Sequence, residues 1–490
     1  MHSASTKLSR GRFLRLAGAG LAGSALLGVS GCGSGGGGVA SVGGSGGDPW
    51  RRFSGMTINF VSENTAPTSA IAASIEPFRE LTGIRVNILQ LELNALVQKV
   101  ALDIGSGQGS YQAIYADPYQ ILAPYREALA GLEEFNADES LPSVPEGMDD
   151  FIPAQLDAAG RFEREDSLFA LPYDCPTMIW MYRRDLFEKY ADRMRQDLGF
   201  DPMPSDESTW DEYYQTARWF NENVDEVPYG TGHQAKQHDA LMCDFSNVLW
   251  SYGGDYFDSG QRVGGLGTAD PGPSLLDRPE AIEAANFYKG LLDIAHPAST
   301  SWDWNGLDEA FRAEQMAMVP SWHENAGNVE TSDIAGKVGY ARLPRGPARS
   351  ANMYGGTGLA INAGAPREEQ EAAWLFLVWA TSPETQLMGL KSEVGGGTPT
   401  RGSLYERPEV REGMRPPTDM PNLLTYEAVE KAWRPENIGL RPKIPSWNEC
   451  DTIIFTELSR MLAGQKTPEA AMRTAKQSFD ETQERIQSLG

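Results

Sequence analysis

Short β-rich runs alternate with helical patterns along the first part of this chain, and this alternation restricts it to an α/β fold. The β-rich runs are residues 57–61, 84–88 and 113–116. Helical patterns cover residues 69–81, 96–104 and 121–129, and the first two are followed by Gly83 and Gly105 as candidate C-caps. Strands that alternate with helices predict a parallel sheet with right-handed crossovers.

Polar side chains follow each of the three predicted strands. In open sheets of this kind, ligands bind in the crevice beyond the carboxyl ends of the strands. The pattern therefore predicts one wall of a polar site. The residues in question are Ser62, Glu63 and Asn64 after the first strand, Glu92 and Asn94 after the second, and Asp117 and Tyr119 after the third.

Strand and helix signals continue along the rest of the chain, without an internal repeat of solenoid length. Thr209 and Glu212 form a capping box that predicts a helix through Phe220. Further helices are expected at 277–292 and 368–381, and after the turn at 464–469, and strands at 316–319, 338–341 and 358–361.

The first 31 residues are a targeting segment and do not belong to the fold. A basic stretch precedes an apolar run, at residues 16–29, that is too short and glycine-rich for a good membrane span. Residues 26–32, which end in Cys32, resemble the lipobox of bacterial lipoproteins. We therefore expect cleavage before Cys32, lipid on its thiol, and a Gly/Ser tether over residues 32–53. Gly11 interrupts a possible arginine pair, which leaves Sec and twin-arginine export both open.

Composition excludes several classes of protein. The formal net charge of −25 argues against nucleic-acid binding, which requires clustered basic residues. Roughly 440 residues remain after the tether, enough for two or three domains. Cys175, Cys243 and Cys450 permit at most one disulfide, and the sequence leaves open whether any two of them pair.

Several ordered segments of the chain resemble one family, the extracellular solute-binding proteins of ABC importers. The resemblance is to the carbohydrate-binding branch called family 1, of which maltose-binding protein is an example. The segments are residues 78–86, 171–174 with 181–187, 209–212, Phe311 with 317–318, 355–361, 399–401 and 464–469.

The resemblance implies a two-lobed α/β periplasmic-binding-protein fold of type II, with parallel or mixed sheets flanked by helices and a hinge between the lobes. Lobe 1 is expected at 54–176 plus 358–394, and lobe 2 at 177–357 plus 395–490. Crossovers between the lobes are expected near residues 173–178, 354–358 and 394–400.

A sugar offers hydroxyl edges and apolar faces, so its receptor needs carboxylates, amides and aromatic rings. Asp117 and Asp174 are the strongest candidates, because both lie at strand ends and at binding positions of the resembled family. A helix cap or a solvated loop is the alternative role for each acid, and the core is the alternative place for Trp250 and Trp447. Arg401 is expected either at the ligand or in a salt bridge between the lobes. The candidate ligand-binding residues are Glu63, Asn64, Asn94, Asp117, Tyr119, Asp174, Trp250, Trp322, Gly355, Gly356, Arg401 and Trp447.

The predicted function is a receptor that captures a monosaccharide, oligosaccharide or polyol and delivers it to an ABC permease. A glycoside-acting enzyme and a receptor for a non-sugar solute are the alternatives. No phosphate-binding loop, nucleophile elbow or zinc-protease motif occurs in the sequence, and the five histidines are scattered. We therefore expect no catalytic residues, no cofactor and no metal. The expected protein is a monomer, anchored by lipid to a Gram-positive-type cell surface, with a periplasmic location as the alternative.

Overall fold

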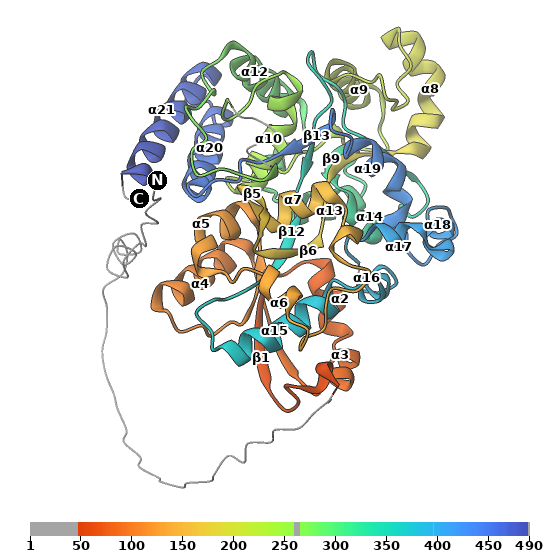
Figure 1. Ribbon diagram of the computed structural model, residues 1–490. Helices are drawn as coiled ribbons and strands as arrows, with labels where there is room; N and C mark the ends of the chain where they lie inside the picture. Colours follow the sequence, from red (N-terminus) through yellow and green to blue (C-terminus); the bar gives the residue numbers. More distant parts are fainter. Residues whose placement is uncertain (1–47, 259–264, 395, 489–490) are drawn as a thin grey trace, which may run out of the picture.

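The computed structural model describes residues 48–258, 265–394 and 396–488. The predicted signal segment, Cys32 and the predicted tether up to residue 47 lie outside the described residues. The described chain forms two α/β lobes, one above the other in Figure 1. This confirms the predicted fold class.

The sheet of the first lobe has the strand order β2-β1-β3-β12-β6. Its strands are β1 (Thr57–Glu63), β2 (Arg85–Leu91), β3 (Ala113–Ala116), β6 (Ala170–Asp174) and β12 (Thr357–Ile361). Strand β1 runs parallel to β2 and β3, whereas β12 runs antiparallel to both β3 and β6. The sheet is therefore mixed, and not the purely parallel sheet that the strand–helix alternation predicts. The reason is that β12 enters this sheet on the chain's return from the other lobe and not through a βαβ crossover.

Two of the predicted helices in the first lobe have different limits in the structure. The helix expected at 69–81 is divided into α2 (Ala66–Ala73) and α3 (Glu76–Thr82). Pro77 lies in the first turn of α3, where a missing N–H costs nothing, whereas inside a longer helix it would break the ladder. Gly83 caps α3 with φ of 74°, as expected. Helix α4 (Leu93–Ser106) ends at Gly107, with φ of 66°, and not at Gly105.

The helix expected at 121–129 is replaced by three short turns. They are a π turn (Pro118–Leu122), α5 (Ala123–Tyr125) and a 3-10 turn (Arg126–Ala128). Helix α15 (Arg367–Ala380) agrees closely with the range expected, and ten of its residues are buried. Its Phe376 ring lies 5.1 Å from that of Phe60 and 5.6 Å from that of Phe78, at the centre of the first-lobe core.

The second lobe is built on a sheet with the order β10-β7-β9-β8. Strand β7 is antiparallel to β9 and β10, and β8 is parallel to β9. The strands are β7 (Met178–Arg183), β8 (Tyr229–Thr231), β9 (Met316–Trp322) and β10 (Val338–Ala341). The larger helices are α8 (Arg184–Leu198), α9 (Trp210–Asn223), α10 (Asp239–Ser251), α12 (Pro279–Ile294), α13 (Trp304–Arg312), α20 (Trp447–Leu462) and α21 (Pro468–Gln487). The capping box of Thr209 and Glu212 is present at α9.

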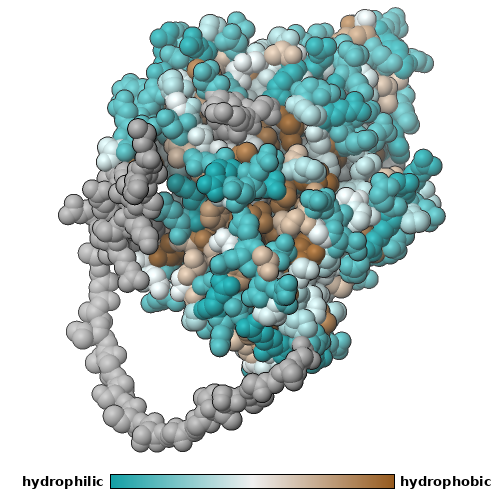
Figure 2. Space-filling view, viewed as in Figure 1, coloured by the Kyte–Doolittle hydropathy of each residue, from teal (hydrophilic) through white to brown (hydrophobic). Residues whose placement is uncertain are grey.

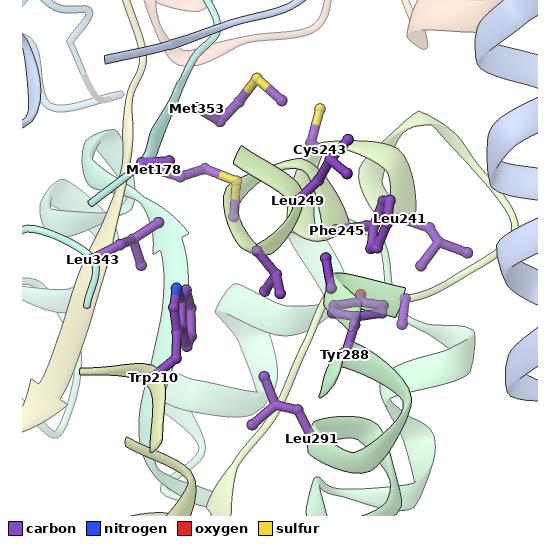
Figure 3. Packing of buried hydrophobic residues seen from close by; sticks show 14 of the residues in the cluster. Met178, Trp210, Leu241, Cys243, Phe245, Leu249, Tyr288, Leu291, Leu343 and Met353 are labelled. Carbon is purple, nitrogen blue, oxygen red and sulfur yellow. The ribbon is translucent and has the colours of Figure 1, made fainter. Parts of the chain in front are cut away.

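The second-lobe core is rich in aromatic and sulfur-containing side chains. Figure 3 shows Leu241, Cys243, Phe245 and Leu249 of α10 beside Tyr288 of α12, with Met178 of β7 on the other side. Burial of these side chains holds α10 against both the sheet and α12. The face shown in Figure 2 is hydrophilic over most of its area, and hydrophobic residues show in the middle of the molecule.

Two short segments lead between the lobes, at positions where crossovers were expected. Residues 175–177 lead from β6 to β7, and Gly355 and Gly356 lead from β11 (Asn352–Tyr354) to β12. The two segments contact each other, since Thr177 pairs with Tyr354 and the N–H of Gly355 donates to the carbonyl of Pro176 at 2.8 Å. Residues 396–400 lie beside them, because the N–H of Thr398 donates to Asp174.

The remaining helices and strands are short and lie around the two large sheets and their helices. Strand β11 pairs with β13 (Ile438–Leu440), and β4 (Arg161–Phe162) pairs with β5 (Arg164–Leu168). The other α-helices are α6 (Glu133–Ala137), α7 (Pro153–Gly160), α14 (Ala326–Val329), α16 (Pro383–Leu390), α17 (Gly402–Glu406), α18 (Pro408–Gly413) and α19 (Tyr426–Ala432). The 3-10 turns not yet named are Pro49–Arg51, Met148–Asp150, Pro297–Ser301, His323–Asn325 and Pro421–Thr425.

The described residues answer two questions, one about disulfides and one about membrane-spanning helices. Cys175, Cys243 and Cys450 are all buried and all free, so no two of them form a disulfide. None of the described helices combines the length and apolar character that a membrane crossing requires.

Candidate ligand-binding site

The first-lobe sheet brings several polar residues to one of its edges. Glu63 ends β1, Asp117 follows β3, and Asp174 ends β6. Strand β12 begins at the same edge because it is antiparallel to its neighbours, with Thr357 opposite Asp174. The structure thus gathers three of the predicted carboxylates at the edge where open α/β sheets bind ligands.

Asp117 has two roles that use its two oxygens separately. Its Oδ1 accepts the backbone N–H groups of Tyr119 and Gln120, at 2.9 and 2.8 Å, so the residue is the cap of the following turn. Its Oδ2 lies 3.3 Å from Nη2 of Arg441, which follows β13 and precedes α20 of the second lobe. The helix-cap alternative therefore holds for one oxygen, while the other faces the opposite lobe.

Arg441 is the central cation of the interface between the lobes. Its guanidinium carbon lies 4.1 Å from the centroid of the Tyr119 ring, a cation–π contact with the first lobe. Its Nη1 lies 3.5 Å from Oδ1 of Asp239, at the start of α10. One guanidinium therefore links Asp117 of the first lobe with Asp239 of the second.

A second acid of the second lobe, Asp451 on α20, lies at the same place. Nε2 of Gln120 donates to Oδ1 of Asp239 at 3.1 Å and to Oδ2 of Asp451 at 3.4 Å. Asn448 donates to the backbone carbonyl of Gln120 at 3.0 Å. We call Glu63, Asp117, Asp239 and Asp451 the interlobe acidic cluster.

Burial dominates the electrostatics of this cluster. Burial, and then the neighbouring Asp117 carboxylate, raise the pKa of Glu63 to about 8, while Tyr115 opposes the shift. Burial and then Asp239 hold the pKa of Asp451 well above its ordinary value. Burial also raises the pKa of Asp117, although Arg441 opposes this. These shifts favour the protonated form of Glu63 near neutral pH, and they favour protonation of Asp451 over that of an ordinary aspartate.

Three buried polar atoms beside the cluster have no hydrogen-bond partner among the described residues. They are the hydroxyl of Tyr119, Oδ1 of Asp451 and Nε of Arg441. Leaving a buried polar group unpaired costs about 1–3 kcal/mol. A hydroxylated ligand offers donors and acceptors that would satisfy all three.

Asp174 lies away from Arg441, in a network between the connecting segments. Its Oδ1 accepts the N–H of Thr398 at 2.7 Å, and its carboxyl is paired with that of Glu324. Asp174 is 1% exposed. Asp174 therefore links the segments that connect the lobes. Asp117, in contrast, lies among the polar groups that face each other across the interface between the lobes.

Trp322 and the two glycines lie together beside the connecting segments. Trp322 ends β9 and is partly buried, and a Cβ on Gly355 would come within 2.7 Å of its ring. A Cβ on Gly356 would overlap the Tyr354 ring, at 2.3 Å. The amide of Gly355 already donates to Pro176, so it is not free for a ligand in this conformation.

The structure places the other candidates outside this region. Trp250 and Trp447 are buried in the second-lobe core, where the Trp447 ring lies 5.2 Å from that of Tyr256. Nε of Arg401 lies 2.7 Å from Oδ2 of Asp150, and its guanidinium covers the Phe151 ring, so the salt-bridge alternative is the one observed. Asn64 and Asn94 are exposed at the ends of their elements.

Sequence reasoning missed Asp239, Arg441 and Asp451. A detectable signal existed for Asp239, which opens α10, a helix whose every residue is buried. Asp451 is likewise an acid on the buried face of α20. An acid on an apolar helix face is a candidate functional group, since its burial needs a partner. Arg441 lies between Gly439 and Pro442 in an irregular segment and gave no comparable signal.

The chain matches the family model described as "Bacterial extracellular solute-binding protein" over residues 62–387. The chain belongs to this family. Its fold is that of the two-lobed type II binding proteins, as the superposition on maltose-bound MalE3 of T. maritima shows. That structure matches with a TM-score of 0.71 and 22% identity, over 87% of this chain and 99% of the other.

Two curated relatives extend the comparison. A probable amino-acid ABC transporter periplasmic-binding protein of Sinorhizobium fredii is 24% identical over 86% of this chain and 88% of its own length. The mannitol-binding protein of Pseudomonas aeruginosa is 24% identical over 79% of this chain and 84% of its own length. The relatives and structural neighbours of this solute-binding protein are binding proteins, which confirms the prediction of a receptor and not an enzyme.

Proposed function

We propose that this solute-binding protein captures a carbohydrate or polyol between its lobes and delivers it to the permease of an ABC importer. The observation that carries the proposal is the contact of Arg441 with Asp117 across the lobes, beside buried polar atoms without partners. Carboxylates and a guanidinium that face each other from two lobes can bind hydroxyl groups from both sides.

Capture would work by a shift between open and closed conformations. A ligand that contacts Asp117 and Tyr119 on one lobe, and Asp239 and Arg441 on the other, binds the closed form better than the open form. The lobes would move about the connecting segments, with lobe 1 at 54–176 plus 358–394 and lobe 2 at 177–357 plus 395–490. The closed form would then dock on the permease, and hydrolysis of ATP in a separate subunit would reopen it.

The lipoprotein part of the proposal rests on the sequence around Cys32. Lipid on this cysteine, followed by the tether predicted up to residue 53, of which Phe53 already packs in the first-lobe core, would keep a monomeric receptor next to its permease. A receptor held in this way needs no outer membrane to retain it. This favours a Gram-positive-type cell surface.

A sugar or polyol is the favoured solute because of what similar proteins bind. The structural neighbour from T. maritima holds maltose, and a relative from P. aeruginosa is named for mannitol. An amino acid is the second candidate, because the S. fredii relative is named as a probable amino-acid binding protein. Of the ligand-contacting residues predicted from the sequence, the proposal keeps Glu63, Asn64, Asn94, Asp117, Tyr119, Asp174, Trp322, Gly355 and Gly356, whereas Trp250, Trp447 and Arg401 have other contacts in this conformation.

A thermal-shift screen with sugars, polyols and amino acids tests the proposal. A ligand at 100 times its dissociation constant stabilises the protein by about 2.7 kcal/mol. Asp117→Asn is expected to weaken binding about tenfold or more, whereas Asp166→Asn, on the exposed β5 strand, is expected to leave it unchanged. A flat response to every sugar and polyol, with a shift for an amino acid, would overturn the proposed solute class.

A further inference from the structure

The interlobe acidic cluster has more carboxyl groups than positively charged partners. Four carboxyl groups face one guanidinium, that of Arg441, which forms ion pairs with Asp117 and Asp239. Across the described parts of the chain, neither Glu63 nor Asp451 forms an ion pair, although Arg441 is near enough to oppose the rise in the pKa of both. The other titratable groups that face the cluster are Tyr115, Tyr119 and the thiol of Cys243, none of which supplies positive charge.

A proton on Asp451 takes the place of a missing cation. Burial, and then the neighbouring Asp239 carboxylate, hold the pKa of Asp451 well above its ordinary value, which favours its protonated form. Oδ2 of Asp451 accepts from Gln120, whereas its Oδ1 is buried and has no partner within the described chain.

We propose that the solute of this site is a polyhydroxylated amine, an amino sugar or amino polyol, whose ammonium group binds beside Asp451 and Asp239. This inference rests on the proposed function, in which a carbohydrate binds between the lobes. An ammonium group supplies a positive charge and three donors, which suit the free oxygen of Asp451 and the Asp239 carboxylate. The hydroxyl of Tyr119 and Nε of Arg441 remain for the hydroxyl groups of the solute.

Ammonium binding has a proton balance that a neutral solute does not share. The amine arrives protonated, and the proton on Asp451, whose pKa is raised by burial, leaves to solvent as this carboxyl group becomes ionised beside the ammonium. Binding of the amine near neutral pH therefore releases up to one proton. A neutral polyol leaves that proton in place, so its binding heat does not depend on the buffer.

The test is calorimetry of the mature protein with two matched pairs of probes. The pairs are D-sorbitol with 1-amino-1-deoxy-D-sorbitol, and D-glucose with D-glucosamine, titrated at pH 7 in phosphate and in Tris. At least one amine is expected to bind ten or more times as tightly as its neutral partner, with proton release seen as a buffer-dependent heat. Asp451→Asn should weaken amine binding about tenfold and remove the proton release.

Glu457→Gln is the matched control, because Glu457 lies on the same helix but pairs with Arg460 and Lys466 away from the cluster. It is expected to change neither the affinity nor the proton release. Equal or tighter binding of the neutral probes overturns the amine inference and leaves the proposed function standing. Failure of both amines to bind also overturns the inference. If the wider sugar and polyol screen is flat as well, the proposed function falls with it.

Discussion

The backbone N–H of Thr398 donates to Oδ1 of Asp174 at 2.7 Å, which ties the end of β6 to the third segment between the lobes. The hydroxyl of Thr398 extends this contact. Nδ1 of His323 accepts the N–H of Thr177 at 3.0 Å, so its Nε2 carries the proton and donates to Oγ1 of Thr398 at 2.8 Å. Oγ1 then donates to Oε1 of Glu324 at 2.6 Å. Burial lowers the pKa of His323 to about 4, which is consistent with this neutral tautomer.

Removal of this hydroxyl should destabilise the protein. Thr398→Val removes the partner of Nε2 of His323 and one donor to Oε1 of Glu324, and we expect a loss of about 1–3 kcal/mol in the free energy of unfolding. Urea denaturation measures the change. Thr331→Val, at an exposed position, is the control and should stay within about 0.5 kcal/mol. An equal effect of the two substitutions would show that the network adds nothing.

Glu63 should make stability depend on pH in a defined direction. Its pKa rises from 4.5 to about 8 on folding, because burial disfavours its charged form. The folded state therefore binds more protons than the unfolded state between these values, so stability falls as pH rises from about 4.5 to 8. In Glu63→Gln, denaturation at pH 5, 6.5 and 8 should show a smaller fall. Glu165→Gln, at an exposed position, should follow the wild type, and identical pH profiles for all three proteins would contradict the assignment.

Lys443 forms a second connection between the lobes. Its ammonium is buried and donates to the carbonyls of Asp157, Ala158 and Arg161, at 2.6, 3.0 and 2.6 Å, around the end of α7. Lys443→Met removes all three bonds, and we expect a loss of about 2–4 kcal/mol in the free energy of unfolding. Lys431→Met, which removes a more exposed lysine, should cost much less. Chemical denaturation of both variants measures the difference.

Truncation of Trp447 should mainly lower stability, whereas truncation of Trp322 should mainly lower solute affinity. Trp447 is fully buried among Tyr256 and Phe479, so Trp447→Ala should cost about 3–5 kcal/mol in the free energy of unfolding. Trp322 is only partly buried beside the connecting segments. Trp322→Ala should therefore lower the free energy of unfolding less than Trp447→Ala does, but should weaken solute binding more. Thermal denaturation with and without solute separates the two effects. Retention of full affinity in Trp322→Ala would exclude a stacking role.

Replacement of Cys32 tests the anchor independently of the fold. Cys32→Ala should release the protein into the medium of expressing cells and leave solute affinity unchanged, because the tether is separate from the binding body. Fractionation of cells and calorimetry of the released protein measure the two properties. A loss of affinity would show that residues 32–53 take part in binding.

The sequence predicted the strands of the first lobe well, because each strand carries its own local pattern. The three runs up to residue 116 appear as β1, β2 and β3, and residues 338–341 coincide with β10. Helix limits were predicted less well where a proline or a second glycine competed. Pro77 divides one expected helix, and Gly107 ends another in place of Gly105.

The sequence by itself determined that strand ends carry acids, because Glu63, Asp117 and Asp174 follow local β patterns. Only the tertiary structure decided what those acids face. Arg441 reaches Asp117 from 324 residues away, and Gln120 reaches Asp451 from 331 residues away. Likewise, only packing decided that Trp250 and Trp447 lie in the core. Local sequence sets backbone conformation through nearby sterics and hydrogen bonds, whereas the partner of a buried charge depends on which distant segments fold against it.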